Sequence, residues 1–306
     1  MGSALRLTVG AGGVGDDADR AATAWSEVMD EFECAEQAMS RFRETSELTI
    51  LNRTAGTGRL VDVGPRLERA VIAADRARRV TGGWFEPRVL ADLDRLGYRG
   101  VRLPSQALGP GPAGRRPHAD VRIAERPGPG CLRIDRPIDL GGIGKGLALR
   151  WAARRLDRLG LMSYLLEAGG DLVARGPGPD GGAWRVGIED PSGAETPLAV
   201  LAATDLAVAT SSVGVHAWVL DGRPVHHLLD PTTGRPGGVG LLAVTVAGND
   251  SAWSEVWSKV LFLAGRQGIA NAARARGLAA WWISADRSLE MTPAARVQTT
   301  WVAAEA

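Results

Sequence analysis

The sequence predicts an α+β fold. Along the 306 residues, predicted strands and helices follow one another irregularly rather than in the strand–helix–strand order of a parallel sheet. The composition, 45% hydrophobic and 23% charged, is typical of a packed globular protein. No internal repeat or coiled-coil heptad pattern is visible, which excludes solenoids and long helical rods.

The first half of the chain predicts one strand, two helices and a long irregular stretch. Residues 4–9 alternate apolar and polar side chains, as a strand does. Residues 17–39 begin with acidic side chains and continue with apolar positions three and four apart, which predicts a helix. A second helix over 65–81 ends at a glycine pair. The segment 104–130 is rich in Pro, Gly and Arg, so we expect a flexible loop or excursion there.

The second half predicts short strands around two helices. One helix covers 144–159 and opens among glycines, and the other covers 251–263. The predicted strands are 131–134, 163–167, 184–188, 199–202, 207–210, 225–229, 241–246 and 279–283.

Charge and cysteine usage exclude several classes of protein. The formal net charge is +1, which argues against nucleic acid or an anionic membrane as a partner. The two cysteines, Cys34 and Cys131, are too far apart in sequence for a metal-binding pair. The first residues do not resemble a signal peptide, and no apolar run is long enough to span a membrane. We therefore expect a cytoplasmic protein.

Lysine is rare in this chain. Only Lys145 and Lys259 accompany 34 arginines. Arginine replaces lysine readily where only a surface charge is needed, but not where a compact ammonium is required. The two lysines are therefore candidate functional residues.

Lys145 lies in a glycine-rich segment, IDLGGIGKG, over residues 138–146. Glycines let backbone amides approach a ligand closely, and the start of a helix favours phosphate. The spacing is neither that of a Walker A loop nor G-x-G-x-x-G. A tight turn that caps a helix is the alternative, and the rare lysine favours a phosphate contact.

Two further segments could carry chemistry. In EAGGD (167–171), two glycines precede Asp171, and a plain β-turn is an equally good interpretation. Three of the four histidines, His216, His226 and His227, lie within twelve positions. His226 and His227 are adjacent on a predicted strand, so their side chains are expected to point to opposite faces.

The last predicted helix carries Glu255 and Lys259 four residues apart, in the favourable order for an ion pair. Taken alone, this pattern predicts a surface ion pair. Trp253 and Trp257, also four apart, are expected to pack into the core.

Taken together, the motifs resemble the ApbE family of FAD:protein FMN transferases, from about residue 25 to about residue 265. IDLGGIGKG, EAGGD and HHLLDPTTG (226–234) carry the resemblance most specifically. It implies a single domain over 1–306, with a mixed, largely antiparallel sheet and flanking helices. The other matching segments are MSRFRETSELTILN (39–52), TGGWFEP (81–87), LGYRG (96–100), WRVGIEDP (184–191) and ATSS (209–212).

The resemblance implies an enzyme that, with Mg²⁺, cleaves the pyrophosphate of FAD. It passes FMN to a threonine of an acceptor protein, within an Asp-x-Ser/Thr-Gly-Ala/Ser-Thr segment, and releases AMP. His227, or its neighbour His226, is expected near the reacting phosphate, and Gly142 is expected to offer its carbonyl to the metal. The residues expected to bind FAD are Phe42, Gly97, Tyr98, Asp139, Lys145, Asp171 and Leu228.

The sequence departs from the family pattern in the helix over 251–263. There the family usually reads Ala-Asp-x-x-x-Thr, with the Asp and Thr side chains on the metal, whereas this chain has Glu255 and Lys259. Glu255 and the carbonyl of Ala252 are still expected at the metal, because carboxylates suit Mg²⁺. Lys259 cannot be a ligand, so it is expected either to act where the metal's charge normally acts or to mark a degraded metal site.

Three activities are therefore open. The chain is expected to transfer FMN to a protein, and the alternatives are FAD binding without transfer and hydrolysis of FAD to FMN and AMP. A histidine or a carboxylate could serve as general base, and the sequence singles out neither. Many relatives are exported lipoproteins, so export is the alternative to the cytoplasm.

Overall fold

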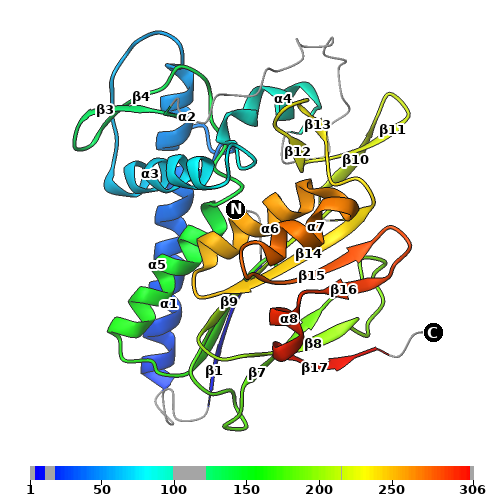
Figure 1. Cartoon of the computed structure of the whole chain (residues 1–306). Helices are drawn as coiled ribbons and strands as arrows, with labels where there is room; N and C mark the ends of the chain where they lie inside the picture. The colour runs from blue at the N-terminus through cyan, green and yellow to red at the C-terminus, as the bar shows by residue number, and fades with distance from the viewer. Residues whose placement is uncertain (1–3, 11–17, 99–121, 215, 304–306) are drawn as a thin grey trace. The chain divides into compact units, whose positions relative to one another are not determined.

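In the computed structural model, residues 4–10, 18–98, 122–214 and 216–303 are described, and they form the α+β architecture that the sequence predicts (Figure 1). Every strand pair among these residues is antiparallel. The chain divides into two compact units. Unit 1 contains Met1–Glu33, Lys145–Ser212 and Val239–Ala306, and unit 2 contains Cys34–Gly144 and Val213–Gly238. The single domain over 1–306 stays a prediction.

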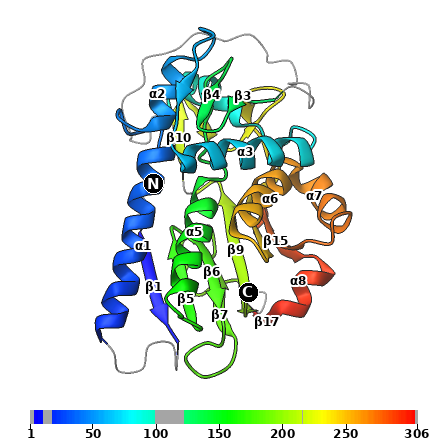
Figure 2. The same cartoon turned by 90° about the vertical axis from the view of Figure 1, so that its left-hand side faces the viewer.

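Unit 1 is built on two antiparallel sheets. The larger has the strand order β1-β5-β6-β9-β14-β15-β16 and the smaller β17-β8-β7. Figure 2 shows β5, β6 and β9 running next to one another. The bounds are β1 Leu5–Val9, β5 Tyr164–Ala168, β6 Asp171–Arg175, β7 Trp184–Ile188, β8 Ala199–Ala203, β9 Leu206–Ser212, β14 Leu241–Gly248, β15 Ala279–Ser284, β16 Leu289–Met291 and β17 Thr299–Val302.

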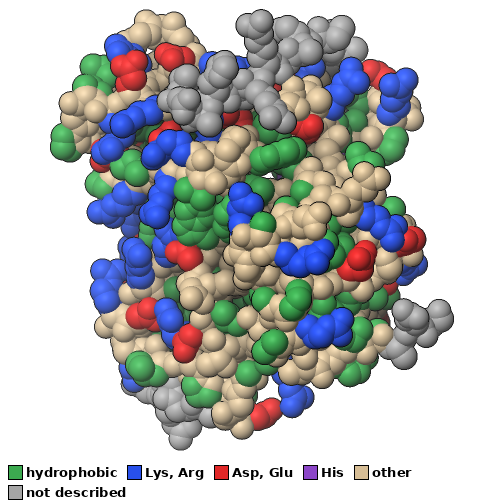
Figure 3. All heavy atoms as spheres, in the orientation of Figure 1, with side chains coloured by type: hydrophobic (Ala, Val, Ile, Leu, Met, Phe, Trp, Pro, Cys, Tyr) green, Lys and Arg blue, Asp and Glu red, His purple; other side chains and the backbone are tan. Residues whose placement is uncertain are grey.

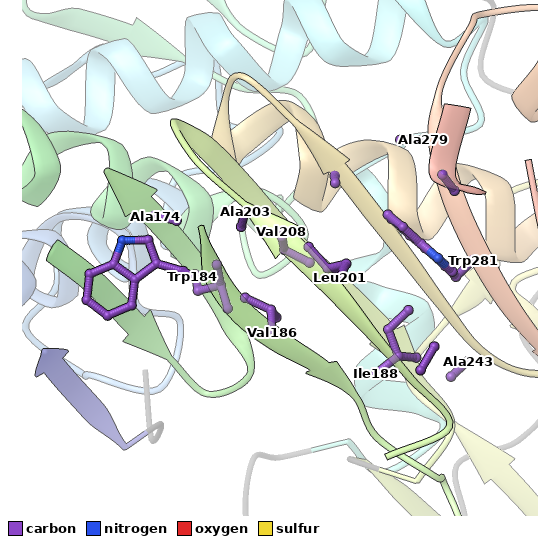
Figure 4. Close-up of a cluster of buried hydrophobic side chains, with 14 of the residues drawn as sticks. Ala174, Trp184, Val186, Ile188, Leu201, Ala203, Val208, Ala243, Ala279 and Trp281 are labelled. Atoms are coloured by element: carbon purple, nitrogen blue, oxygen red, sulfur yellow. The ribbon is translucent and has the colours of Figure 1, made fainter. Parts of the chain in front are cut away.

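The core of unit 1 lies where the two sheets face each other (Figure 4). Along β7 and β8, buried residues alternate with more exposed ones, so that Trp184, Val186 and Leu201 point into the cluster. Val208 and Trp281 enter it from the larger sheet. Burying such apolar side chains supplies the main stabilisation of a two-sheet core.

Helices cover the other face of the larger sheet. Helix α6, Ser251–Leu263, packs on β9 and β14. Val208 of β9 enters the core between the sheets, whereas Ser211, three residues on, hydrogen-bonds Ser258 of α6 (Oγ–Oγ 2.8 Å). The odd spacing places these two side chains on opposite faces of β9. The remaining helices of unit 1 are α5 Gly144–Arg158, α7 Gly265–Arg274 and α8 Pro293–Gln298.

Helix α1, Ala18–Met39, is the long first helix that the sequence predicts. Within unit 1 it is tied to α5 through Arg155. The guanidinium of Arg155 lies 2.6 Å from a carboxylate oxygen of Glu27 and 2.6 Å from one of Glu31. The acidic residues sit four apart on α1, so a single arginine on the neighbouring helix reaches both.

Unit 2 combines short helices with three small sheets. The sheets have the orders β2-β4-β3, β10-β11 and β12-β13. The helical elements are α2 Glu47–Arg53, α3 Pro65–Val80, η1 Pro87–Val89 and α4 Leu90–Arg95. The strands are β2 Val61–Asp62, β3 Glu125–Gly128, β4 Cys131–Arg133, β10 Ala217–Leu220, β11 Arg223–His226, β12 Leu229–Asp230 and β13 Arg235–Pro236.

Two sequence predictions need correction. Of the predicted loop over 104–130, the part up to residue 121 lies outside the described residues, and the rest contains β3, which pairs with β4. The predicted strand over 225–229 is two strands, β11 and β12, with different partners. Both errors arise because very short strands are defined by their partners, which local composition does not reveal.

On the lower half of the face in Figure 3, basic and acidic side chains are interspersed, without a patch of one sign. Among the described helices, none combines the length and apolar character needed to cross a bilayer.

Candidate functional site

Lys145 and Asp171 meet in unit 1 at the turn between β5 and β6. This turn is a two-residue hairpin loop, with φ of 57° at Gly169 and 89° at Gly170. Positive φ at both positions is characteristic of the turn that joins tightly paired strands, and it explains the glycine pair in EAGGD. Asp171 follows directly, and its carboxylate accepts a 2.5 Å hydrogen bond from Lys145 Nζ.

Both oxygens of Asp171 are engaged. Oδ2 receives the ammonium of Lys145, and Oδ1 accepts a 3.0 Å hydrogen bond from the backbone N–H of Thr210 in β9. The Asp171 side chain is only 3% exposed, whereas that of Lys145 is 24% exposed. Asp171 therefore anchors the lysine from inside the fold, and the lysine is the member of the pair that a ligand can reach.

A second ammonium–carboxylate pair lies on α6. Lys259 Nζ is 3.2 Å from Glu255 Oε1, and Glu255 Oε2 accepts a 2.8 Å hydrogen bond from the backbone N–H of Gly146. The Glu255 side chain is 1% exposed and that of Lys259 17%. The prediction of a surface ion pair is therefore wrong: the carboxylate is buried.

Gly146 is required where α5 begins, because α6 approaches it closely. A Cβ on Gly146 would lie 2.5 Å from the carbonyl oxygen of Ser251 and 2.6 Å from Cα of Ala252. These are backbone atoms, which cannot move aside as a flexible side chain could. In addition, Ser251 Oγ donates a 2.7 Å hydrogen bond to the Gly146 carbonyl. The last glycine of IDLGGIGKG thus brings the start of α5 against the first turn of α6.

The two ion pairs act on one another electrostatically. Burial raises the pKa of Glu255, and the charge of Asp171 acts in the same direction. The positive charges of Lys259 and Lys145 and the hydrogen bond from Gly146 oppose this rise. Lys145, Asp171, Glu255 and Lys259, which we call the lysine–carboxylate cluster, therefore form one electrostatic unit.

These residues do not fit a divalent cation. The side chain of Glu255 is only 1% exposed, and each of its oxygens is already in contact with an N–H donor, so a cation would have to displace these donors to reach it. The ammonium of Lys259 would also repel a cation. Nowhere in the described ranges do three His, Cys, Asp or Glu side chains come together as a metal site. Glu255 and Ala252, which were expected at the metal, therefore lack further ligand side chains and have a positive charge beside them in the described part of the chain.

Unit 2 carries an aromatic cluster around Tyr98. The ring of Trp218 stacks on it, with centroids 5.4 Å apart and planes 13° apart, and the ring of Phe42 meets it edge-on at 6.2 Å. The rings of His216 and His227 lie 5.4 and 5.9 Å from Tyr98. The structure therefore brings together three predicted site residues, Phe42, Tyr98 and His227. Phe42 is 52% exposed, so its ring is available to a flat ligand.

Arg41 joins this cluster to Asp139. Its guanidinium carbon lies 4.5 Å from the ring centre of Phe42 and 4.9 Å from that of Tyr98. Its Nε lies 3.1 Å from Asp139 Oδ2, and its Nη2 donates a 2.8 Å hydrogen bond to the Tyr98 carbonyl. Asp139 Oδ1 in turn accepts a hydrogen bond of 2.6 Å from Gly141 N. Asp139 therefore contacts both the glycine loop, through Gly141 N, and the arginine that packs on the two aromatic rings.

The two adjacent histidines have different surroundings. His226 ends β11 and is partly buried, and its Nδ1 accepts a 3.3 Å hydrogen bond from Leu228 N. Burial lowers the pKa of His226, and a backbone hydrogen bond with Gly237 only partly offsets this. His227 instead packs its ring against His216 and Tyr98. The geometry favours His227 over His226 as the histidine presented to a ligand.

The lowered pKa of His226 predicts that this side chain contributes to the pH dependence of stability. A histidine whose pKa is lower in the folded state takes up its proton more readily after unfolding, so stability falls as the pH drops below the unfolded value of about 6.5. We expect His226→Gln to reduce the loss of stability between about pH 7.5 and pH 5.5, as measured by urea unfolding at each pH. An unchanged slope would contradict it.

The other predicted residues occupy supporting places. Gly97 has φ of 79°, which a glycine adopts easily, and it ends the turn after α4 just before Tyr98. Gly142 lies in the turn before α5, Leu228 is buried between β11 and β12, and Ala252 is buried in the first turn of α6.

Sequence reasoning missed two contributors to these clusters, Arg41 and Trp218. Arg41 was not singled out, although it stands next to Phe42 in MSRFRE. Trp218 contacts Tyr98, which is distant in sequence. Thr210 lies in the matching segment ATSS, but the contact of its backbone N–H with Asp171 was not predicted.

Comparison with known proteins identifies the same family that the sequence motifs resemble. The ApbE family model matches residues 1–282. The FAD:protein FMN transferase of Salmonella typhimurium is 28% identical over 293 residues, which cover 92% of this chain and 82% of that protein. The protein of the same name from Escherichia coli K12 is 27% identical over 280 residues, 88% of this chain and 79% of its own length.

Solved structures show the same fold. The flavin transferase ApbE from Vibrio cholerae aligns with a TM-score of 0.80 at 23% identity, over 97% of this chain and 96% of that one. The ApbE protein from Thermotoga maritima gives the same four values. These likenesses confirm the predicted α+β class with antiparallel sheets.

Proposed function

The chain belongs to the ApbE family, and we propose that it is a FAD:protein FMN transferase that moves FMN from FAD to a threonine hydroxyl of an acceptor protein. The names of its relatives support the reaction. The lysine–carboxylate cluster is the observation in the structure that carries the proposal, because it offers two ammonium groups anchored on buried carboxylates.

The chemistry of the reaction explains the need for anchored ammonium groups. The threonine oxygen attacks the phosphorus of the FMN half of FAD and forms a phosphoester. The bond from that phosphorus to the bridging oxygen breaks, and the oxygen leaves with AMP. Negative charge builds on the phosphate oxygens and the leaving oxygen, and positive groups fixed beforehand stabilise it. Lys145 and Lys259 can supply this charge, and a base must accept the hydroxyl proton.

Unit 2, taken by itself, offers a surface for a flat ring. A flavin or adenine is a flat ring, and Phe42, with Tyr98 and Arg41 beside it, offers an exposed aromatic surface for stacking.

Incubation with FAD and an acceptor that carries an Asp-x-Ser/Thr-Gly-Ala/Ser-Thr segment tests the function. We expect the acceptor to gain the mass of one FMN group at its threonine, with one AMP released for each flavin attached. An acceptor with alanine in place of that threonine is the matched control and should remain unmodified. Because the metal requirement is in question, the assay is run both with Mg²⁺ and with EDTA.

Two other results would replace the proposal. AMP released without flavin on the protein would indicate FAD hydrolysis, with water in place of threonine. Tight FAD binding without AMP in either condition would indicate a flavin-binding protein. The position of Lys259 against Glu255 is the observation that keeps this last alternative open.

A further inference from the structure

Lys259 carries an ammonium that a buried carboxylate, that of Glu255, holds in a defined place. Glu255 is almost completely buried, and its two oxygens accept hydrogen bonds from Lys259 Nζ and Gly146 N. Lys259 itself is 17% exposed. The pair thus has a buried anchor and a partly exposed positive end.

The same arrangement occurs at Lys145. Its anchor, Asp171, also uses one oxygen for the ammonium and the other for a backbone N–H, that of Thr210. The chain's only two lysines are therefore placed in the same way, on separate elements, within one electrostatic cluster.

This arrangement selects the charge of the ligand. Both carboxylates are almost completely buried and each of their oxygens contacts an N–H donor, so they are poorly placed to meet a cation from solvent. The more exposed member of each pair is the lysine, and its ammonium attracts phosphate oxygens. A diphosphate suits two ammonium groups, because each of its phosphates carries negative charge.

We propose that Lys259, held by Glu255, and Lys145, held by Asp171, bind the diphosphate of FAD directly, so that this chain binds its nucleotide without a divalent cation. Lys259 thereby supplies a positive charge at a place where a cation cannot be ligated. The proposal rests on the proposed function for the identity of the nucleotide. The cluster alone points to an anion with two adjacent negative groups, such as a diphosphate.

Equilibrium binding separates this proposal from the transfer activity. ADP carries the diphosphate without the flavin, and its binding to the purified full chain can be measured by isothermal titration calorimetry. In EDTA we expect ADP to bind, and we expect saturating Mg²⁺ to change its Kd by less than about twofold. Lys259→Met should raise the Kd in EDTA by about 10- to 100-fold, the loss expected for one charge-assisted hydrogen bond.

Two further variants keep the test decisive. Glu255→Gln combined with Lys259→Met removes both charges and leaves no buried carboxylate without its ammonium, so it serves if the single variant fails to fold. It should also weaken ADP binding. Arg274→Met removes one positive charge from an exposed site on α7 and should leave the Kd unchanged.

The outcomes distinguish this proposal from the proposed function. ADP binding that EDTA abolishes and Mg²⁺ restores would overturn the proposal and leave the transferase assignment intact. Unchanged ADP affinity in the folded Lys259 variants would also overturn it. Metal-independent ADP binding in a protein that never attaches FMN to an acceptor would support it and contradict the transferase.

Discussion

Replacing Glu86 with glutamine is expected to destabilise the protein by about 3–5 kcal/mol. Arg78 is completely buried in α3, and its Nε lies 2.7 Å from Glu86 Oε2. Arg88 donates to both oxygens of the same carboxylate. The glutamine keeps the shape of the side chain but leaves two largely buried guanidinium groups without this negative charge, and an uncompensated buried charge is costly.

Urea unfolding of the two proteins measures this effect. Glu44→Gln is the matched control in the same unit, because Glu44 pairs with Arg53 on the surface. That substitution should cost about 0–1 kcal/mol, as exposed ion pairs do. Equal losses in the two variants would show that the burial of the Arg78–Glu86–Arg88 group contributes nothing.

The pH dependence of the same group has a defined sign. Burial alone would raise the pKa of Glu86, but the hydrogen bonds from Arg88 and Arg78 outweigh burial and lower it below 4.5. A carboxylate with a lowered folded pKa stabilises the protein fully above its unfolded pKa and loses this contribution as the pH falls through the folded value. The stability difference between wild type and Glu86→Gln should therefore shrink below about pH 4.5.

The parts of the fold that the sequence predicts are those set by local patterns. Helix α6 was predicted over Ser251–Leu263, the bounds that it has, from its local sequence. The structure adds that the Asp250 side chain caps its first turn. Strand β7 was likewise predicted over Trp184–Ile188, where burial alternates. In contrast, α7 was missed although Ile269 and Ala273 mark a buried face, because its two glycines, Gly265 and Gly268, disfavour a helix locally. The short strand β16 depends on its pairing with β15, which a local pattern does not contain.

In the candidate site, too, the sequence predicted what local patterns determine and missed what tertiary packing determines. The rarity of lysine pointed to Lys145 and Lys259 before any contact was known. The sequence also placed Glu255 opposite Lys259 on one helix face, but a spacing of four residues is identical in buried and exposed pairs. Burial of Glu255 depends on the close approach of α6 to Gly146, a contact between segments more than 100 positions apart. Tertiary packing therefore decides what the local pattern leaves open.

Replacing Lys145 with methionine is expected to lower kcat/KM for flavin transfer by about 10²- to 10³-fold, the usual effect of removing one preorganised group that stabilises transition-state charge. The ammonium of Lys145 is fixed by its 2.5 Å hydrogen bond to Asp171, and Asp171 is itself fixed by Thr210 N. A group held in this way stabilises developing charge without reorganising during the reaction. The transfer assay with varied FAD concentrations gives kcat and KM separately.

Two variants distinguish charge stabilisation from damage to the fold. Lys145→Arg keeps the positive charge but replaces a compact ammonium with a planar fork, so only part of the activity should return. Arg154→Met removes a positive charge from the exposed side of the same helix, α5, and should leave kcat and KM unchanged. If Lys145→Met raises KM alone, Lys145 binds the ground state and transition state equally, and its role is nucleotide binding. A fall in kcat would assign it to the charge that forms as the bond to AMP breaks, and normal transfer by the methionine variant would remove Lys145 from the mechanism.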